Sequence, residues 1–393
     1  GVWSVPTTGR SILPVSSLWV VIIGLVTSLL VMACGTPPGA GITSDYRLDG
    51  DTEIGISFPD LEDERARELT AEHLAALGVE TIRFNAPWHF REPERDSYNW
   101  DPMDRRMTFL EEQGLQALVT FPANAPDWIR QGLPDRRRNP RSVALDADGN
   151  REFAEYVGDF LERYERRNPG VIAYVQFANE WAGEYHYVGT GEDFTATQRV
   201  FHETATTAVP DTPVVLGGFS VGQVGGMALI DGRVAWVWDD DGSKVTIDEF
   251  SEAEITAFEE RVAVVLDDGH YDWIDFHLYD QYEDWSAYFA ALRERVPASF
   301  SGEYIVTEFG GPHPVAEKRL SDDEHAERVE AYIRAVDQLP ELGLALHFRL
   351  VRSPDATHSE SGLMEQGLFR VRKLPGYEVF RAIVKKTEET GHN

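Results

Sequence analysis

The chain has 393 residues, of which 42% are hydrophobic and 11% are aromatic, enough to build a large core. Its 67 acidic and 36 basic residues give a formal net charge of −31, which argues against binding to nucleic acid. Only five of the basic residues are lysines, and the acidic residues are spread along the whole chain. An ordinary acidic enzyme can carry such a charge, but the pattern favours a halophilic protein, because strong self-repulsion is tolerated best under salt screening.

The first 33 residues carry a single charge, Arg10, and residues 16–33 form an uncharged apolar run. A run of this length is typical of a signal peptide, with an uncleaved membrane anchor as the alternative. The run ends in Val-Met-Ala-Cys-Gly and resembles the lipobox of bacterial and archaeal lipoproteins, in which the cysteine is lipidated. Cys34 is the only cysteine, so no disulfide forms within the chain. We therefore expect a signal peptide over 1–33, a flexible tether over 34–52 and an exported protein held at the membrane through Cys34.

Strand and helix patterns alternate from residue 53 onward. Eight segments have strand composition: 54–58, 81–85, 116–121, 173–179, 213–219, 273–279, 304–308 and 344–350. Helical periodicity lies between and after them, at 62–77, 103–113, 152–166, 196–208, 252–266, 287–296, 322–338 and 376–387. Eight such units predict an α/β fold, a (β/α)8 TIM barrel forming a single catalytic domain over 53–393. A doubly wound sheet is the main alternative, but no glycine-rich G-x-G-x-x-G loop follows the first strand.

Two connections that follow strands are long. Residues 122–150 follow the third strand, and residues 220–251 follow the fifth and contain a segment typical of a small hairpin. Loops that follow barrel strands lie on the catalytic face. We therefore expect both segments to shape the cleft.

Two predicted strands end on a glutamate. Residues 174–181 read Tyr-Val-Gln-Phe-Ala-Asn-Glu-Trp, and residues 304–311 read Tyr-Ile-Val-Thr-Glu-Phe-Gly-Gly. Parallel barrel strands bring such ends together at one mouth. Two carboxyl groups facing one cleft, here Glu180 and Glu308, are the equipment of glycoside hydrolysis.

Strand alternation places further polar residues at the same mouth. Arg83 and Asn85 share one face of the second strand, while His277 and Tyr279 share one face of the sixth. These faces must point into the barrel, because the side facing the helices needs apolar residues. A structural polar layer is the alternative, above all for His277, because a lone histidine is often a satisfied core residue.

These motifs together resemble glycoside hydrolase clan A, the retaining β-glycosidases with a (β/α)8 barrel. The clan carries Asn-Glu at the end of strand four and Glu at the end of strand seven, which match Asn179-Glu180 and Glu308. Its strand-two arginine matches Arg83, and its strand-six His-x-Tyr matches His277 and Tyr279. The resemblance implies Glu180 as acid/base, Glu308 as nucleophile, Asn179 as a contact to the sugar 2-hydroxyl, and Arg83 and Tyr279 as groups that hold the nucleophile.

Clan members commonly carry a tryptophan on strand eight as a sugar platform, and residues 344–350 of this chain contain none. Aromatic faces stack on sugar rings, so tryptophans near strand ends are candidate subsite walls, with core packing as the alternative. Three of them follow strand ends and are predicted to contact substrate: Trp88, Trp128 and Trp181. Two more lie in the long fifth loop: Trp236 and Trp238.

The sequence therefore predicts a retaining hydrolase of β-linked glycans that requires no cofactor or metal. The apolar strand, the neighbouring Trp181 and the charge on Glu308 are expected to raise the pKa of Glu180, so that it holds a proton. One alternative is an inactive barrel that only binds glycan at the cell surface. The other is a metal-dependent hydrolase, which the sequence disfavours because it shows no clear ligand cluster at the strand ends.

Overall fold

The computed structural model describes residues 44–49, 51–130, 142–183, 186–317, 319–353, 357–367 and 371–390. The predicted signal peptide, Cys34 and most of the predicted tether lie outside these residues. Within the part of the chain described, none of the helices has the length and apolar character needed to cross a membrane.

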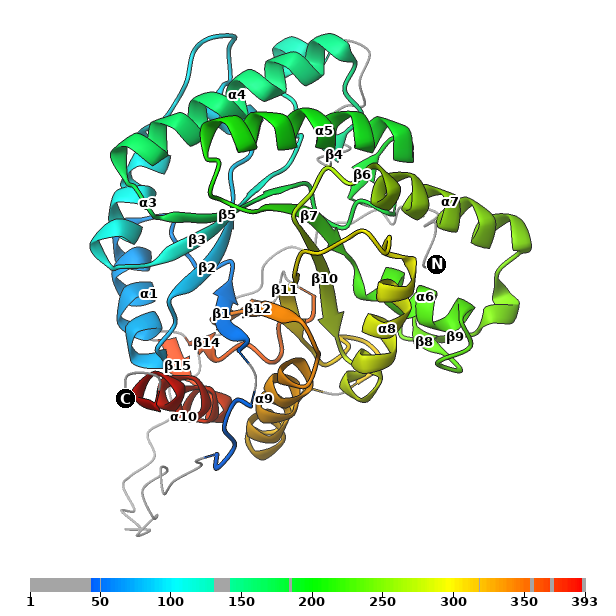
Figure 1. Cartoon of the computed structure of the whole chain (residues 1–393). Helices are drawn as coiled ribbons and strands as arrows, with labels where there is room; N and C mark the ends of the chain where they lie inside the picture. The colour runs from blue at the N-terminus through cyan, green and yellow to red at the C-terminus, as the bar shows by residue number, and fades with distance from the viewer. Residues whose placement is uncertain are drawn as a thin grey trace, which may run out of the picture.

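Eight parallel strands close into a barrel in the order β1-β12-β11-β10-β7-β5-β3-β2 (Figure 1). Their bounds are β1 Glu53–Ser57, β2 Thr81–Asn85, β3 Gln116–Phe121, β5 Ile172–Phe177, β7 Val214–Phe219, β10 Trp273–Tyr279, β11 Tyr304–Gly310 and β12 Leu342–His347. Every predicted strand is present, and the predicted TIM barrel is confirmed. The fourth predicted strand, 173–179, extends past the observed end of β5 at Phe177, where the chain leaves the sheet.

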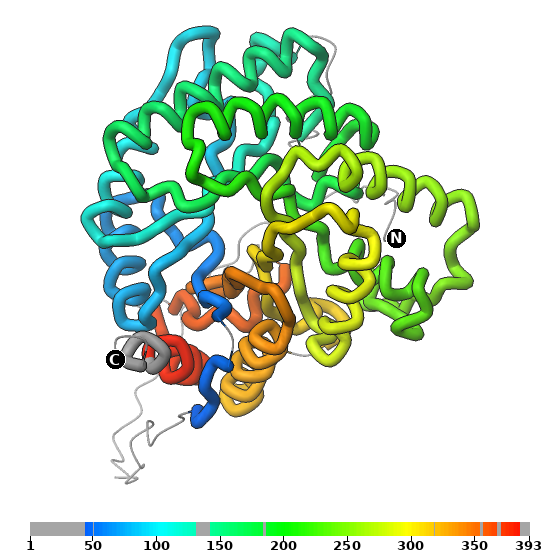
Figure 2. The backbone as a smooth tube through the Cα atoms, viewed as in Figure 1, coloured from blue at the N-terminus to red at the C-terminus, as the bar shows by residue number. Residues whose placement is uncertain are grey.

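Helices surround the barrel and bury their apolar faces against it (Figure 1). The long ones are α1 Glu64–Leu77, α3 Asp101–Glu112, α4 Ala147–Arg167, α5 Gly191–Ala208, α7 Glu252–Asp268, α8 Trp285–Arg295, α9 Asp322–Asp337 and α10 Pro375–Thr390. Capping boxes begin α5, α7 and α9, where a Ser or Thr side chain accepts from the third helical amide. The last two helices, α9 and α10, lie side by side, and α10 also contacts α1, which completes the ring of helices (Figure 2).

The predicted loop 220–251 contains a helix that the sequence analysis missed. Helix α6 spans Val221–Ile230 and begins with a capping box formed by Ser220 and Gln223. Its three glycines, which are poor helix formers, hid the helical pattern. The hairpin expected further along is present as β8 Val237–Trp238 and β9 Lys244–Val245.

The other long connection, 122–150, is described in part. It contains a 3-10 turn, Asp127–Ile129, the short strand β4 Ser142–Val143 and the start of α4. Strand β4 pairs with β6, Tyr187–Val188, which lies in the loop after β5. The remaining small sheet, which follows β12, comprises β13 Val351–Arg352, β14 Met364–Gln366 and β15 Val371–Lys373.

The barrel interior is divided into two layers. The lower layer is an apolar cluster separate from the helix-facing core, formed by Leu118, Val215, Ile305, Leu344 and Leu346. Other interior side chains are polar, and Arg83, Gln176, Asp275 and His277 are all fully buried. Strand alternation explains the change, since each strand places every second side chain inside. The apolar cluster thus lies beneath the polar side chains at the mouth of the barrel.

Candidate active site

Glu308 lies within β11 and points into the barrel mouth. The pairing of β11 with β10 contains a bulge, because Asp275 is opposite Ile305 whereas His277 is opposite Glu308. Strict alternation would place Thr307 and Glu308 on opposite faces of the strand. The bulge absorbs one residue, so both side chains bond to interior residues.

Both oxygens of Glu308 are held by short hydrogen bonds from the barrel wall. Nη1 of Arg83 donates to Oε1 at 2.6 Å, and the Tyr279 hydroxyl donates to Oε2 at 2.6 Å. The Arg83 cation balances the buried carboxylate charge, which alone would be costly. The Glu308 side chain nevertheless remains 10% exposed, so it stays open to the mouth.

Arg83 is itself fixed by three further acceptors. Its Nε donates to Thr120 at 3.0 Å, and its Nη2 donates to Gln176 at 2.9 Å and to Asn179 at 2.7 Å. The last bond engages the carbonyl oxygen of the Asn179 amide, so the NH2 group of that side chain points elsewhere and is suited to donate to a hydroxyl. The guanidinium thus orients the nucleophile candidate and its neighbour together.

Glu180 lies beyond the end of β5 and reaches the mouth through an unusual backbone. Ala178 has φ of 62° and Glu180 has φ of 46°, both in the left-handed region that residues with a Cβ seldom adopt. Such backbone clusters at functional sites, where the surrounding structure enforces it. The turn directs the Glu180 carboxylate back toward His277, whose Nδ1 lies 2.7 Å from Oε1.

The hydrogen bonds around His277 define where its protons lie. The Thr307 hydroxyl donates to Asp275 at 2.6 Å, so its oxygen can only accept from Nε2 of His277, at 3.1 Å. Nε2 therefore carries a hydrogen, and one further proton is shared between Nδ1 and Glu180. Burial lowers the pKa of His277, but the charge of Glu308 and hydrogen bonds to Asp275 and Glu180 outweigh burial and raise it to about 10.

Glu180 does not have the raised pKa that the sequence analysis expected. Burial raises its pKa, as predicted, but hydrogen bonds with His186 and His277 outweigh burial and bring the pKa well below its usual range. Nε2 of His186 lies 2.7 Å from Oε2 of Glu180. The lowered pKa of Glu180 and the raised pKa of His277 together favour a carboxylate beside a protonated imidazole.

The two candidate catalytic carboxylates lie close together. One oxygen of Glu180, one oxygen of Glu308 and a ring nitrogen of His277 all lie within 4.8 Å of one another. Such a triad also has the ligand types of a divalent metal site. The expectation that the strand ends lack a ligand cluster is therefore wrong, since the described residues contain this one.

The predicted tryptophan walls divide into three groups. Trp88 and Trp181 are 0% exposed, so the prediction that they contact substrate is wrong: both are core residues. Trp88 Nε1 donates to Glu92, and Trp181 Nε1 donates to the carbonyl of Gly217. Trp128 is half-buried and packs edge-on against Trp88, so its role stays a prediction.

The other predicted tryptophans, Trp236 and Trp238, are also half-buried. They pack edge-on against each other on the β8–β9 hairpin, and Nζ of Lys244 lies 3.7 Å from the centre of the Trp236 ring. This cation–π contact occupies one face of Trp236. Their role as subsite walls likewise stays a prediction.

Several functional neighbours were missed by sequence reasoning. Gln176 and Thr120 face inward by the same alternation that identified Arg83, so the signal was present in the strand pattern. His186 lies in a loop, where no strand or helix period applies. At the end of β12, where the usual tryptophan is missing, the Phe348 ring packs edge-on against Tyr279 at 5.6 Å and Phe58 at 6.4 Å.

Comparisons with known proteins match the first half of the barrel in sequence. The Glyco_hydro_42 beta-galactosidase family model matches residues 58–185, which include Arg83, Asn179 and Glu180 but not Glu308. Beta-galactosidase BgaP of Planococcus sp. (strain L4) is 26% identical over 132 residues, 30% of this chain and 19% of the relative. Beta-galactosidase BgaA of Planococcus sp. (strain 'SOS Orange') matches to the same extent, so the chain spans about a fifth of these curated relatives.

Solved structures match almost the whole barrel in shape. A GH5_18 structure from Streptomyces cattleya has a TM-score of 0.61 at 16% identity, covering 87% of this chain and 81% of that one. Native xylanase 10B from Thermotoga maritima has a TM-score of 0.55 at 13% identity, covering 86% and 97%. A beta-glucosidase from Exiguobacterium marinum has a TM-score of 0.55 at 14% identity, covering 86% and 98%. At these identities the likeness establishes the TIM-barrel fold that glycoside hydrolases also use.

Proposed function

We propose that the protein is a retaining glycoside hydrolase that cleaves β-linked glycosidic bonds, with Glu308 as nucleophile and Glu180 as acid/base. The observation that carries this proposal is the approach of carboxylate oxygens of the two residues to within 4.8 Å at the barrel mouth. Retaining enzymes place their two carboxyl groups about 5–5.5 Å apart, whereas inverting enzymes need about 6.5–9.5 Å to admit a water. The short separation supports the double-displacement mechanism.

The surroundings of Glu308 suit a nucleophile. Hydrogen bonds from Arg83 and Tyr279 fix its two oxygens, so the carboxylate can be presented to the anomeric carbon without side-chain reorganisation. Attack forms a glycosyl ester and breaks the bond to the leaving oxygen, which takes its proton from the Glu180 side. The ester removes the negative charge of Glu308, after which Glu180 can accept a proton from the attacking water.

The surroundings of Glu180 supply the proton. The hydrogen shared with Nδ1 of His277 lies on a bond of 2.7 Å, so a small movement transfers it to the carboxylate. A leaving oxygen that develops negative charge would draw this proton onward. His277 thus holds the proton that Glu180 transfers. Thr307 accepts a hydrogen bond from Nε2 of His277 and donates one to Asp275, and these bonds fix the imidazole ring.

The matches described above give a first substrate to test. The relatives and family model are beta-galactosidases, and their match covers the segment that carries Asn179 and Glu180. We therefore rank β-galactosides first, with β-glucosides, β-mannosides and β-xylosides as comparisons. Phe348 places an aromatic ring at the end of β12, where the clan usually places a tryptophan, and Arg349 lies over one of its faces.

A panel of 4-nitrophenyl β-glycosides tests the proposal directly. The wild-type protein should release nitrophenol from at least one of them, and Glu308→Gln should lose at least a thousandfold in kcat. Glu303→Gln is the matched control, because Glu303 is exposed near the opposite end of the same strand. A wild-type protein that binds glycans but hydrolyses none would support the inactive glycan-binding barrel.

A metal-dependent hydrolase is the second candidate, because Glu180, His277 and Glu308 form a group that can hold a divalent ion. The proposal expects activity to survive exhaustive treatment with EDTA. Loss of activity that returns on adding Zn²⁺ or Mn²⁺ would instead identify a metal enzyme.

We also propose that the protein is exported and lipidated at Cys34, an expectation that rests on the sequence alone. Cys34→Ser should release the protein from membranes or block its processing. Unchanged membrane association together with an unchanged N-terminal mass would contradict lipidation.

A further inference from the structure

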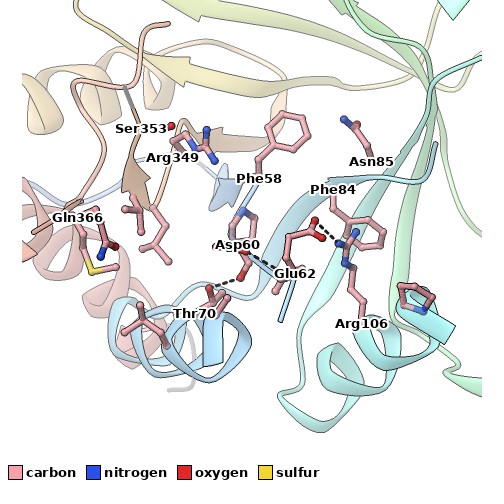
Figure 3. Close-up of a pocket in the computed structure, with 18 of the residues that line it drawn as sticks. Phe58, Asp60, Glu62, Thr70, Phe84, Asn85, Arg106, Arg349, Ser353 and Gln366 are labelled. Atoms are coloured by element: carbon pink, nitrogen blue, oxygen red, sulfur yellow. Dashed lines mark hydrogen bonds and ion pairs between the residues drawn. The ribbon is translucent and has the colours of Figure 1, made fainter. Parts of the chain in front are cut away.

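A cavity of about 700 Å³, within the size range of small-molecule sites, lies between the carboxyl ends of β1, β2 and β12 and helices α1 and α3 (Figure 3). Its upper wall comes from the carboxyl ends of three barrel strands, with Phe58 after β1, Asn85 at the end of β2 and Arg349 after β12. The Phe58 ring packs against the Arg83 guanidinium, with 4.9 Å between ring centre and Cζ. Because Arg83 also donates a hydrogen bond to Glu308, a chain of contacts leads from Phe58 in the cavity wall to the proposed nucleophile.

The charge of the cavity lining is opposite to that of the protein. The whole chain has 67 acidic and 36 basic residues, whereas the charged lining residues comprise four arginines and two acids: Arg91, Arg106, Arg349, Arg352, Asp60 and Glu62. Three of these arginines have partners. Arg106 pairs with Glu62 at 3.2 Å, Arg352 pairs with Glu365 at 3.3 Å, and Arg91 donates to the Asn99 carbonyl at 3.4 Å.

Arg349 differs from the other lining arginines. Its side chain is half-buried, and across the described part of the chain no hydrogen bond or ion pair reaches its guanidinium. Burial lowers the pKa of Arg349 and outweighs the nearby charges of Tyr279, Asp60 and Glu308, which act to raise it. Figure 3 shows it beside Phe58 at the edge of the cavity. The guanidinium lies over the Phe348 ring, with 5.7 Å between Cζ and the ring centre, so its one contact among the described residues is a cation–π contact and its N–H donors are left for an anionic ligand.

The place of Arg349 in the barrel indicates which part of a glycan would meet it. In the closed order of eight strands, β12 lies directly across the barrel from β5. Glu180 follows β5, so the leaving group departs on that side. The sugar that stays on Glu308 therefore extends its ring substituents toward β12 and Arg349.

We propose that this cavity selects a glycone that carries an anionic group, a hexuronic acid carboxylate or a sulfate ester, bound by Arg349. The inference rests on the proposed glycosidase function and adds its substrate class. A guanidinium matches both anions through two parallel N–H donors, and such charge-assisted bonds are stronger than neutral ones. Asp60, which is exposed on the same wall, opposes the anion and so limits affinity.

The test compares charged and neutral glycones with the same leaving group. 4-Nitrophenyl β-glucuronide and β-galacturonide are measured against the β-glucoside and β-galactoside, and a 6-sulfated β-galactoside forms the sulfate arm. The wild-type ratio of kcat/KM, anionic over neutral, should exceed ten for one of the two anions. The arm with the higher ratio identifies carboxylate or sulfate as the natural group.

Four variants test the residue assignment through that ratio. Arg349→Gln should lower it at least tenfold, and Arg349→Lys should recover part of it, since lysine keeps the charge but not the paired donors. Asp60→Asn should raise it. Arg65→Gln, which removes an exposed arginine on α1, should leave it unchanged. Thermal unfolding of each variant checks that the fold is intact.

Two outcomes overturn the inference while leaving the proposed function standing: hydrolysis that favours neutral glycones, or an anionic preference that Arg349→Gln does not change. If no glycoside is hydrolysed, the proposed function fails. Calorimetric titration with a β-linked disaccharide of glucuronic acid then tests separately whether the cavity binds an anionic sugar. Binding to the wild type that is lost in Arg349→Gln supports the anion site. Absent binding, or equal binding by both proteins, contradicts it.

Discussion

The two candidate catalytic carboxylates are held in different ways. Glu308 lies within a strand, and its partners Arg83 and Tyr279 come from two other strands of the barrel. Glu180 lies in a left-handed turn beyond the end of β5, and its partners are the imidazoles of His277 and His186. One carboxylate is thus paired with a permanent cation, and the other with groups that exchange protons.

This difference matches the two tasks of the proposed reaction. A nucleophile needs a constant charge and a fixed position, which a guanidinium and three strands provide. An acid/base must gain and lose a proton within each cycle, which a fixed cation would prevent. The comparison therefore predicts that changes on the two sides of the mouth have different chemical consequences.

The largest expected effects come from removing each carboxylate. Glu308→Ala should abolish turnover of an activated substrate, and added azide should restore it with inversion. Glu180→Ala should still cleave substrates with good leaving groups, because they need no proton, and azide should then give a product of retained configuration. The readout is the configuration of the glycosyl azide by NMR, with Glu303→Ala as control; the reverse pattern would exchange the two roles.

Removing the permanent cation should have the next largest effect. Arg83→Met leaves the buried charge of Glu308 without its main partner and should cost about 3–5 kcal/mol of unfolding free energy. Arg105→Met, at an exposed position on α3, should change stability by less than about 0.5 kcal/mol. Urea denaturation measures both. Equal effects of the two substitutions would show that Arg83 does not offset the buried charge of Glu308.

The pH dependence of stability should also distinguish the surroundings of Glu180 from those of Glu308, with a smaller effect. The pKa of His277 is raised to about 10 in the folded protein, from an ordinary value of 6.5. Stability from the charged imidazole is therefore fully present below about pH 6.5 and is lost as pH rises toward 10. The stability difference between wild type and His277→Asn should shrink across this window.

The corresponding difference for Arg83→Met provides the comparison, because a guanidinium stays protonated throughout that range. The stability difference between wild type and Arg83→Met should stay constant over the pH range in which the difference for His277→Asn falls. Two parallel curves would contradict the distinction between a permanent cation and a titrating one.

Sequence reasoning succeeded where side chains follow the strand period. Alternation alone predicted that Arg83, His277 and Tyr279 face the mouth, and each now bonds to one of the two glutamates or lies beside them. The position of Glu308 was also predicted, but the bulge that lets Thr307 share its face was not. A bulge depends on pairing with a neighbouring strand, and one strand's sequence does not encode that register.

Prediction was weaker where the chain leaves the sheet. Trp181 was expected to face substrate, yet the turn after β5 buries its ring against Phe194, with 4.5 Å between ring centres. The pKa of Glu180 was predicted from its own strand and its carboxylate neighbour. The histidine hydrogen bonds that reverse it come from β10 and from a loop, through contacts that local sequence does not reveal.

The central claim is that a covalent intermediate forms on Glu308. An activated 2-deoxy-2-fluoro β-glycoside of the preferred sugar should inactivate the protein, because the fluorine slows hydrolysis of the glycosyl ester more than its formation. Proteolysis and mass spectrometry should then find one added glycosyl group on the peptide that contains Glu308, and none on that peptide in Glu308→Gln. A label on Glu180, or continued turnover with no label on any peptide, would contradict the account.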